Sequence, residues 1–317
     1  MTTDRLIGKV CFGLIATGLL FFLKGHCFAQ SIHIPEHIPK VLNTLPVYFK
    51  PLEQALLIDA SDGILNSFSL IDAGLIASGA TTNYTLSKHK RQFKTLQQHA
   101  LLSIPYLMQT ERMAVEIFNY LHRRVLRRFE TRPVTLLDLW SKGRYKCVTA
   151  SYIYLIIART YDLPVIIIET PMHAYIQLQI SPPLPIELTV PNGGFNFSQT
   201  QEQVIQNLLL VGLITPKDLT THTPKALFEA YRERQRALTP VQVLSVFFYN
   251  RALSAFEHYN PAEAFQHALA AYLIHPEDHR YQRLLHDFGL AYATTLHREN
   301  QQDARKAILA YLETLKE

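Results

Sequence analysis

The chain has 317 residues, of which 48% are hydrophobic and 18% are charged, and its formal net charge is +5. This composition is typical of a globular protein with ample apolar material for a core, and it excludes an intrinsically disordered chain. The length suits about two domains of roughly 100–200 residues each. Basic clusters at residues 88–91 and 122–128 lack the interleaved aromatic residues of a nucleic-acid site, so we expect no nucleic-acid partner.

The N-terminus has the pattern of an export signal. Arg5 and Lys9 come before an apolar run over residues 10–23, and Cys-Phe-Ala follows at residues 27–29. The run is shorter than the roughly 20 apolar residues of a membrane span, which favours a signal peptide over residues 1–29, cleaved after Ala29. An uncleaved N-terminal anchor is the alternative, since Cys-Phe-Ala is not an ideal cleavage site. We therefore expect a periplasmic or secreted protein, in contact with the membrane only if this segment is retained.

The cysteine count makes one thiol prominent. Cys11 and Cys27 both lie in the predicted signal, so cleavage would leave Cys147 as the only cysteine of the mature chain. A single cysteine cannot form an internal disulfide, and a free thiol in an exported protein is unusual. Cys147 is therefore either a reactive group or a small buried apolar residue.

The middle of the chain predicts helices followed by strands. Apolar residues recur every three or four positions between about Pro51 and Arg128, which indicates helices. A further helix is expected from Cys147 to about Tyr161, ended by Pro164. Apolar runs and period-two alternation predict three strands after it, separated by a turn at 181–185 and followed by a turn at 191–194. The three expected strands cover residues 164–169, 172–180 and 186–190. The prediction is an α+β fold with a helical N-terminal part.

The C-terminal part has a weak helical repeat. Everything beyond Gln201 has a helical pattern, and from Val241 small residues recur at the offsets of a tetratricopeptide repeat. The first unit contains Ala252, Ala264, Ala268, Ala271 and Pro276, and the weaker second unit contains Ala291, Ala304, Ala307 and Tyr311. An ordinary alanine-rich helical hairpin is the alternative. We expect one domain over residues 45–235 and a repeat-like helical module over residues 240–317.

Three residues of the middle region suit a catalytic triad. At the start of a helix, unpaired backbone N–H groups and the positive end of the helix dipole would favour the thiolate of Cys147. A hairpin centred near Ile180 would place His173 directly opposite Glu187, on the polar faces of their strands, with Cβ atoms about 5 Å apart. The carboxylate would orient the imidazole, and the imidazole would pair with the thiolate. A structural histidine and a solvated glutamate are the alternative interpretation.

The same stretch resembles a known family. Residues 143–151 (Gly-Arg-Tyr-Lys-Cys-Val-Thr-Ala-Ser), Leu163-Pro164, Pro171-Met172-His173, Ile186 to Thr189 and Asn192-Gly193-Gly194 resemble the bacterial transglutaminase-like superfamily. The branch that joins this core to tetratricopeptide repeats is the most similar. The resemblance implies a papain-like core with Cys147 as nucleophile, His173 as base and Glu187 as orienting acid. The acid of this superfamily is often Asp, and some members have lost catalysis, so the resemblance implies the fold more strongly than the activity.

Thiol acyl-transfer chemistry is the function that this set of residues favours. Water would resolve the acyl-enzyme in a peptidase or amidase, and an amine would resolve it in a transglutaminase. The repeats favour a protein or peptide as substrate or partner. We expect no cofactor and no metal, since Pro35 interrupts the His33–His37 pair and no other histidine spacing supports a site. The alternative function is a non-catalytic envelope scaffold that binds a partner through its repeats.

Overall fold

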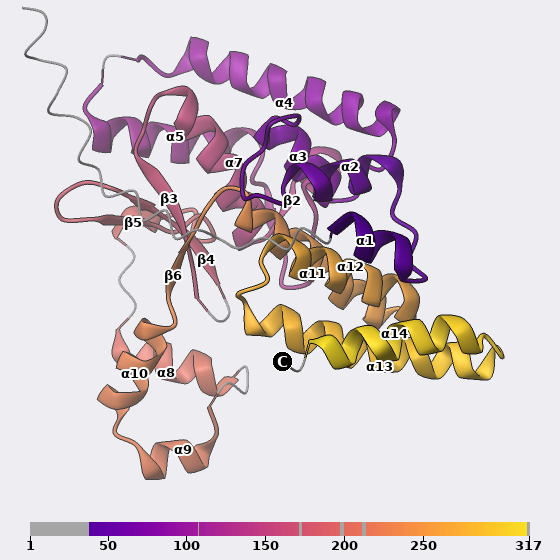
Figure 1. Ribbon diagram of the computed structural model, residues 1–317. Helices are drawn as coiled ribbons and strands as arrows, with labels where there is room; N and C mark the ends of the chain where they lie inside the picture. Colours follow the sequence, from indigo (N-terminus) through magenta and orange to yellow (C-terminus); the bar gives the residue numbers. More distant parts are fainter. Residues whose placement is uncertain (1–37, 107, 171–172, 197–199, 211–213, 316–317) are drawn as a thin grey trace, which may run out of the picture. The chain divides into compact units, whose positions relative to one another are not determined.

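The computed structural model describes residues 38–106, 108–170, 173–196, 200–210 and 214–315 (Figure 1). The predicted signal peptide, the pair His33 and His37, and the motif residues Pro171 and Met172 lie outside the described residues. No helix in the described ranges is long and apolar enough to cross a membrane. Both predicted domains, 45–235 and 240–317, fall within one compact unit that spans residues 34–317.

Among the described residues, five helices precede the region of the predicted site. Ser69 and Thr82 cap the third and fourth of them by accepting a backbone hydrogen bond in the first turn. The fourth helix ends two residues before Pro105, which cannot continue the helical hydrogen bonding. The five are α1 (Ile38–Thr44), α2 (Pro51–Asp59), α3 (Leu70–Ala77), α4 (Asn83–Ser103) and α5 (Thr110–Arg124). The predicted helical character of this region is confirmed.

A short parallel pair of strands leads the chain to Cys147. Strand β1 (Arg128–Phe129) pairs with β2 (Arg144–Tyr145), and α6 (Leu136–Lys142) connects them. Helix α6 ends at Gly143, whose φ of 63° lies in the left-handed region that glycine adopts without a steric penalty. This reversal directs the chain from α6 into β2, two residues before Cys147.

Helix α7 (Cys147–Thr160) is the central helix of the core, and its bounds agree with the sequence prediction to one residue. Every residue from Cys147 to Ala158 is buried, which explains why the sequence of this helix shows no polar face. Its tyrosines satisfy their hydroxyl groups on neighbouring backbone. Tyr152 donates to the carbonyl of Leu70 at 2.6 Å, and Tyr154 donates to that of Ala114 at 2.9 Å.

One face of α7 packs on a four-stranded antiparallel sheet, so the chain is a mixed α and β protein (Figure 1). The strand order is β5–β4–β3–β6, with β3 (Val165–Glu169), β4 (Ala174–Leu178), β5 (Leu184–Ile186) and β6 (Arg236–Leu238). Two sequence predictions are wrong here. The third strand covers 184–186 instead of 186–190, so it contains Pro185, which we expected in a turn. Strand β6 lies in a segment that we expected to be entirely helical.

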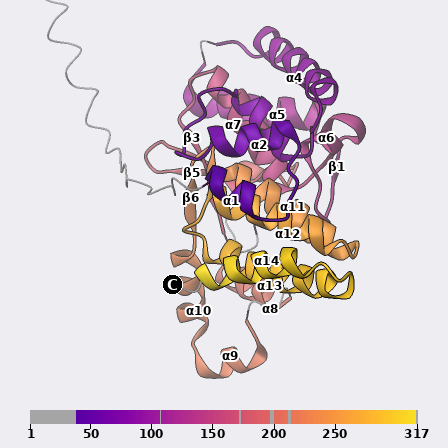
Figure 2. The same ribbon diagram turned by 45° about the vertical axis from the view of Figure 1, so that its right-hand side comes forward.

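The described residues between β5 and β6 form three short helices. A 3₁₀ turn (Gly194–Asn196) precedes α8 (Gln201–Leu210), α9 (Pro216–Thr221) and α10 (Pro224–Glu233). Helix α10 packs against α8, whereas α9 joins them at one end (Figure 2). Neither α9 nor α10 has a buried residue.

Four longer helices complete the chain, each packed against the next in sequence (Figure 2). They are α11 (Gln242–Glu257), α12 (Pro261–Ile274), α13 (His279–Arg298) and α14 (Gln302–Thr314). The alanines of the first expected repeat unit, Ala252, Ala264, Ala268 and Ala271, are all fully buried. Those of the second unit, Ala291, Ala304 and Ala307, are only half-buried. Small residues thus allow close helix packing mainly between α11 and α12.

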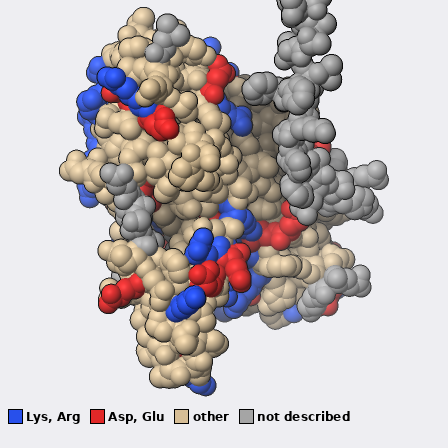
Figure 3. Space-filling model, turned by 90° about the vertical axis from the view of Figure 1, so that its left-hand side faces the viewer, with Lys and Arg blue, Asp and Glu red and all other residues tan. Residues whose placement is uncertain are grey.

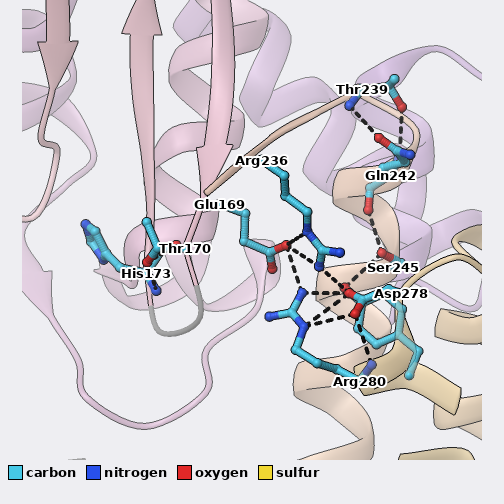
Figure 4. Close-up of polar contacts among 10 residues, drawn as sticks. Glu169, Thr170, His173, Arg236, Thr239, Gln242, Ser245, Asp278 and Arg280 are labelled. Carbon is cyan, nitrogen blue, oxygen red and sulfur yellow. Dashed lines mark hydrogen bonds and ion pairs between the residues drawn. The ribbon is translucent and has the colours of Figure 1, made fainter. Parts of the chain in front are cut away.

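A cluster of four charges, with buried carboxylates and partly exposed arginines, ties the helices after β6 to the sheet (Figure 4). This arginine cluster comprises Glu169 of β3, Arg236 of β6, Asp278 at the N-cap of α13 and Arg280. Glu169 Oε2 is 2.7 Å from Arg236 Nη2 and 2.8 Å from Arg280 Nη2. Both arginines also pair with Asp278.

Charges of opposite sign also lie side by side on the surface. In the middle of the face shown in Figure 3, Lys and Arg lie beside Asp and Glu, and much of the rest of that face is uncharged.

Candidate active site

Cys147 is the first residue of α7 and is the one cysteine in the described part of the chain. Lys146, before it, is extended, with φ −130° and ψ 173°. Its N–H donates to Thr149 Oγ1 at 2.8 Å, and the Thr149 hydroxyl donates back to its carbonyl at 2.9 Å. These two bonds fix the first turn of the helix and with it the direction of the cysteine side chain. The residue is 9% exposed, and its thiol forms no disulfide.

His173 lies at the hairpin between β3 and β4, one residue before β4 begins. Thr170 holds it there: the Thr170 N–H donates to the His173 carbonyl at 2.8 Å, and the His173 N–H donates to Thr170 Oγ1 at 3.1 Å. The imidazole is 28% exposed, so one side of the ring faces solvent. Figure 4 shows Thr170 and His173 on the opposite side of this hairpin from the arginine cluster.

Glu187 lies one residue after β5 and is 2% exposed. Its Oε2 is 2.5 Å from His173 Nε2, and its Oε1 accepts from the N–H and the hydroxyl of Thr189 at 2.8 and 2.6 Å. Its backbone N–H donates to the Gly194 carbonyl at 2.9 Å. A Cβ on Gly194 would be 2.3 Å from the Glu187 carbonyl oxygen, so only glycine permits this close approach.

The structure brings Cys147, His173 and Glu187 together, but through a different register from the predicted one. The observed pairs are Ile176 with Ile186 and Leu178 with Leu184, so the hairpin is centred one residue later than expected. His173 and Glu187 are therefore not directly opposed, and neither lies inside a strand. Because the pairing is displaced by two residues, the two side chains stay on the same face of the sheet and still meet.

The surroundings of Cys147 favour its thiolate. Its sulfur is hydrogen-bonded to the His173 imidazole and accepts from the backbone N–H of Ala174. Burial raises the pKa of the thiol, but these two hydrogen bonds and the positive charges of His173 and Lys146 outweigh burial and lower it below its usual range. Because Nε2 of the imidazole is bonded to Glu187, Nδ1 is the ring nitrogen that remains for the sulfur.

The surroundings of His173 favour its charged form. Burial alone would lower the pKa of the imidazole, but hydrogen bonds to Cys147 and Glu187, together with their negative charges, raise it to about 10. Burial likewise raises the pKa of Glu187, and its bonds to His173 and Thr189 reverse that effect and lower it. The three groups together stabilise a thiolate, an imidazolium and a carboxylate in a row.

A cleft of about 170 Å³ opens beside His173 and Glu187. We call it the His173 cleft. One wall contains these two residues and Tyr175 of β4, and the other contains side chains of α8 and α10. In the described residues, no group of three or more His, Cys, Asp or Glu side chains is arranged to hold a metal ion.

Three residues that shape the site escaped the sequence analysis as contributors. Thr170 fixes the turn before His173, Thr189 holds the second oxygen of Glu187, and Gly194 allows the backbone to pass behind Glu187. Thr189 was within reach of sequence reasoning, because a threonine two residues after an acid can bond its side chain. The other two depend on the hairpin and on a loop contact, which have no local signal.

The comparisons of the chain with protein-family models, with curated proteins and with solved structures give no match.

Proposed function

We propose that this protein is a thiol-dependent acyl-transfer enzyme that uses Cys147 as nucleophile, His173 as acid and base, and Glu187 as orienting acid. The observation that carries the proposal is the continuous hydrogen-bonded row from the cysteine sulfur through the imidazole to a buried carboxylate. A structural cysteine has no need of a histidine partner, and a structural histidine has no need of a carboxylate that is itself held by Thr189.

The reaction would proceed in two steps. The Cys147 thiolate attacks the carbonyl carbon of an amide, and the His173 imidazolium gives its proton to the departing amine nitrogen as the C–N bond breaks. A thioester remains on Cys147. Water or an amine then attacks the thioester, His173 accepts the proton of the attacking group, and the C–S bond breaks to restore the thiolate. Water makes the enzyme a peptidase or amidase, and an amine makes it a transglutaminase.

The N-terminus of α7 supplies the electrostatic part of this mechanism. The backbone N–H groups of the first helical turn have no carbonyl partner within the helix. Because Cys147 is the first residue of α7, these groups belong to the same end of the helix as the sulfur. The helix dipole adds positive potential at this end, where an oxyanion on the attacked carbonyl would be stabilised.

The wider architecture fits a transglutaminase-like, papain-type core with a repeat-like helical module. In support, a helix that begins with the cysteine packs on an antiparallel sheet that carries the histidine, with the acid just after the next strand. Helices α11 to α14 pack in consecutive pairs, as tetratricopeptide-type repeats do. With the signal-like segment at residues 1–29, we propose that the enzyme acts outside the cytoplasm on a protein or peptide.

The rate of Cys147 alkylation by iodoacetamide, measured against pH, tests this function. The chain would carry Cys11→Ser and Cys27→Ser, so that Cys147 is its only thiol. We expect rapid alkylation to persist well below pH ~7 and to require pH above ~8 in the His173→Ala variant, where the thiol loses its charged partner.

His258→Ala is the matched control, because it removes an exposed histidine at the end of α11. It should leave the profile unchanged. An alkylation profile of the parent chain centred near pH ~8.5, the value of an ordinary thiol, would overturn the enzyme proposal. The non-catalytic scaffold function would then remain, and the near-complete burial of Cys147 would agree with a structural role for this residue.

A further inference from the structure

Aromatic side chains line the His173 cleft together with His173 and Glu187. Tyr175 comes from β4, Phe228 and Tyr231 come from α10, and the buried Val204 of α8 adds to the apolar lining. Phe228 and Tyr231 are three residues apart and thus share one face of α10. The cleft is therefore an apolar slot with the imidazole at one edge.

The aromatic side chains of α10 are not buried in the hydrophobic core. An amphipathic helix normally buries its apolar face against the rest of the domain. Helix α10 has no buried residue, and Phe228 and Tyr231 remain half-exposed toward the cleft. Two large apolar surfaces that stay accessible beside a reactive group have the character of a small-molecule or side-chain binding site.

The size of the cleft limits what it can hold. Its volume of about 170 Å³ is close to that of a cavity of about 150 Å³ that binds benzene in another protein. One aromatic ring or one large aliphatic side chain fits such a space.

The charges around the cleft select against ions. The carboxylate of Glu187 is already bonded to His173 and Thr189, so it is not free to bind a cation. Arg232 lies at the rim with its side chain 59% exposed, 3.8 Å from Glu229, and its positive charge repels a second cation. Apart from Thr170 and Gln235, the rest of the lining is apolar or aromatic, which disfavours a desolvated charge of either sign.

We propose that the His173 cleft binds an uncharged aromatic or large aliphatic group of the substrate, next to the carbonyl that Cys147 attacks. This inference rests on the proposed function. The enzyme would then act on peptides or acyl donors that carry such a group beside the reacting carbonyl, and α10 would be the element that determines specificity.

The alkylation of Cys147 by a matched pair of reagents tests the inference. Iodoacetamide and N-benzyl-iodoacetamide carry the same reactive carbon, and only the second carries a ring. Their rate ratio with the protein is divided by their ratio with glutathione, which removes the intrinsic difference in reactivity. We expect a corrected preference of about tenfold for the benzyl reagent, the size of effect that partial burial of a ring supplies. N-(2-aminoethyl)-iodoacetamide, a cation, should show no preference.

Phe228→Ala should bring the corrected ratio close to one. Leu227→Ala is the matched control, because Leu227 is the half-buried neighbour on the same helix and lines a different cavity with Leu208 and Ile214. Tyr231→Ala provides a second test if the first variant does not fold, as judged by circular dichroism. A corrected ratio near one in the parent chain, or equal losses in Phe228→Ala and Leu227→Ala, would overturn the inference.

The two proposals fail separately. The function fails on the pH profile of iodoacetamide alone, whichever reagent is preferred. The cleft inference fails if the corrected rate ratio of the two reagents is near one. This ratio can be compared at any pH at which Cys147 reacts, because both reagents react with the same thiol.

Discussion

Two buried glutamates near the same sheet show how the partner, more than the carboxylate, decides what a site can do. Glu169 ends β3 and meets two arginines, whereas Glu187 follows β5 and meets a histidine and a threonine. Arginine stays charged at all accessible pH values, so the arginine cluster keeps one protonation state. A histidine, unlike an arginine, can lose and regain its proton at accessible pH values, so the second site can exchange a proton.

The two glutamates also differ in how the charges around them are balanced. In the arginine cluster two carboxylates face two guanidinium groups, and each charge has an opposite partner (Figure 4). In the candidate triad the row ends at the sulfur of Cys147, beside the start of a helix. The cluster is suited to holding elements together, and the triad is suited to presenting a nucleophile.

Breaking the arginine cluster should have the largest effect on stability. Asp278→Ala leaves two guanidinium groups, each about a third exposed, with one carboxylate, so a partly buried positive charge loses its partner. We expect the free energy of unfolding in urea to fall by about 2–3 kcal/mol, between the values of an exposed and a fully buried pair. The pH profile of Cys147 alkylation in the folded protein should not change.

Asp303→Ala removes an exposed acid in the first turn of α14 and is the control for this variant. A loss below about 1 kcal/mol in Asp278→Ala, the value of an exposed ion pair, would show that the cluster does not hold the structure together.

The charge of His173 should persist far above the usual range of a histidine. Its pKa is raised to about 10 by its bonds to Cys147 and Glu187. A raised pKa means that the charged imidazole stabilises the fold fully below pH ~6.5 and that this contribution is lost as pH rises through about 10. Titration of the imidazole followed by NMR measures this directly. A midpoint near pH ~6.5 would show that the ring lacks charged partners.

Glu187→Gln should weaken the thiolate without removing the fold. The amide keeps the size of the side chain but takes away the negative charge that helps to hold His173 protonated. We expect alkylation of Cys147 at pH 6 to slow by about tenfold, which corresponds to about 1.4 kcal/mol. Glu202→Gln, on the exposed face of α8, is the control. Equal alkylation rates in Glu187→Gln and Glu202→Gln would show that Glu187 does not contribute to the reactivity of Cys147.

The sequence was sufficient for the elements whose signals are local. Helix α7 was predicted from Cys147 to about Tyr161 and ends at Thr160, because a small polar start and Pro164 mark its limits. Strands β3 and β4 were predicted within two residues at each end, because β-branched residues and alternation mark them. The pairing of His173 with Glu187 followed from strand faces, since the face on which a side chain lies is unchanged by a displacement of two residues.

The misplaced strands are those at the edges of the sheet. Pro185 indicated a turn, yet β5 is an edge strand, where a residue without an N–H donor is tolerated. Strand β6 is three residues long and pairs with β3 some 70 positions earlier, so its position is set by a non-local partner. The arginine cluster depends on that pairing, so no local sequence pattern indicates it.

The smallest effect on stability and on Cys147 alkylation should come from a change at Thr189. Such a change alters what orients the Glu187 carboxylate but leaves its charge in place. Thr189→Val keeps the backbone N–H bond to Glu187 Oε1 and removes only the hydroxyl bond. We expect a loss of about 1 kcal/mol in stability and a reduction in Cys147 alkylation at pH 6 of well under tenfold, because the carboxylate keeps its charge and its bond to His173. Thr189→Ser restores the hydroxyl and should recover both values. If Thr189→Val instead slowed alkylation as much as Glu187→Gln, the direction of the carboxylate would matter more to the thiolate than its charge does.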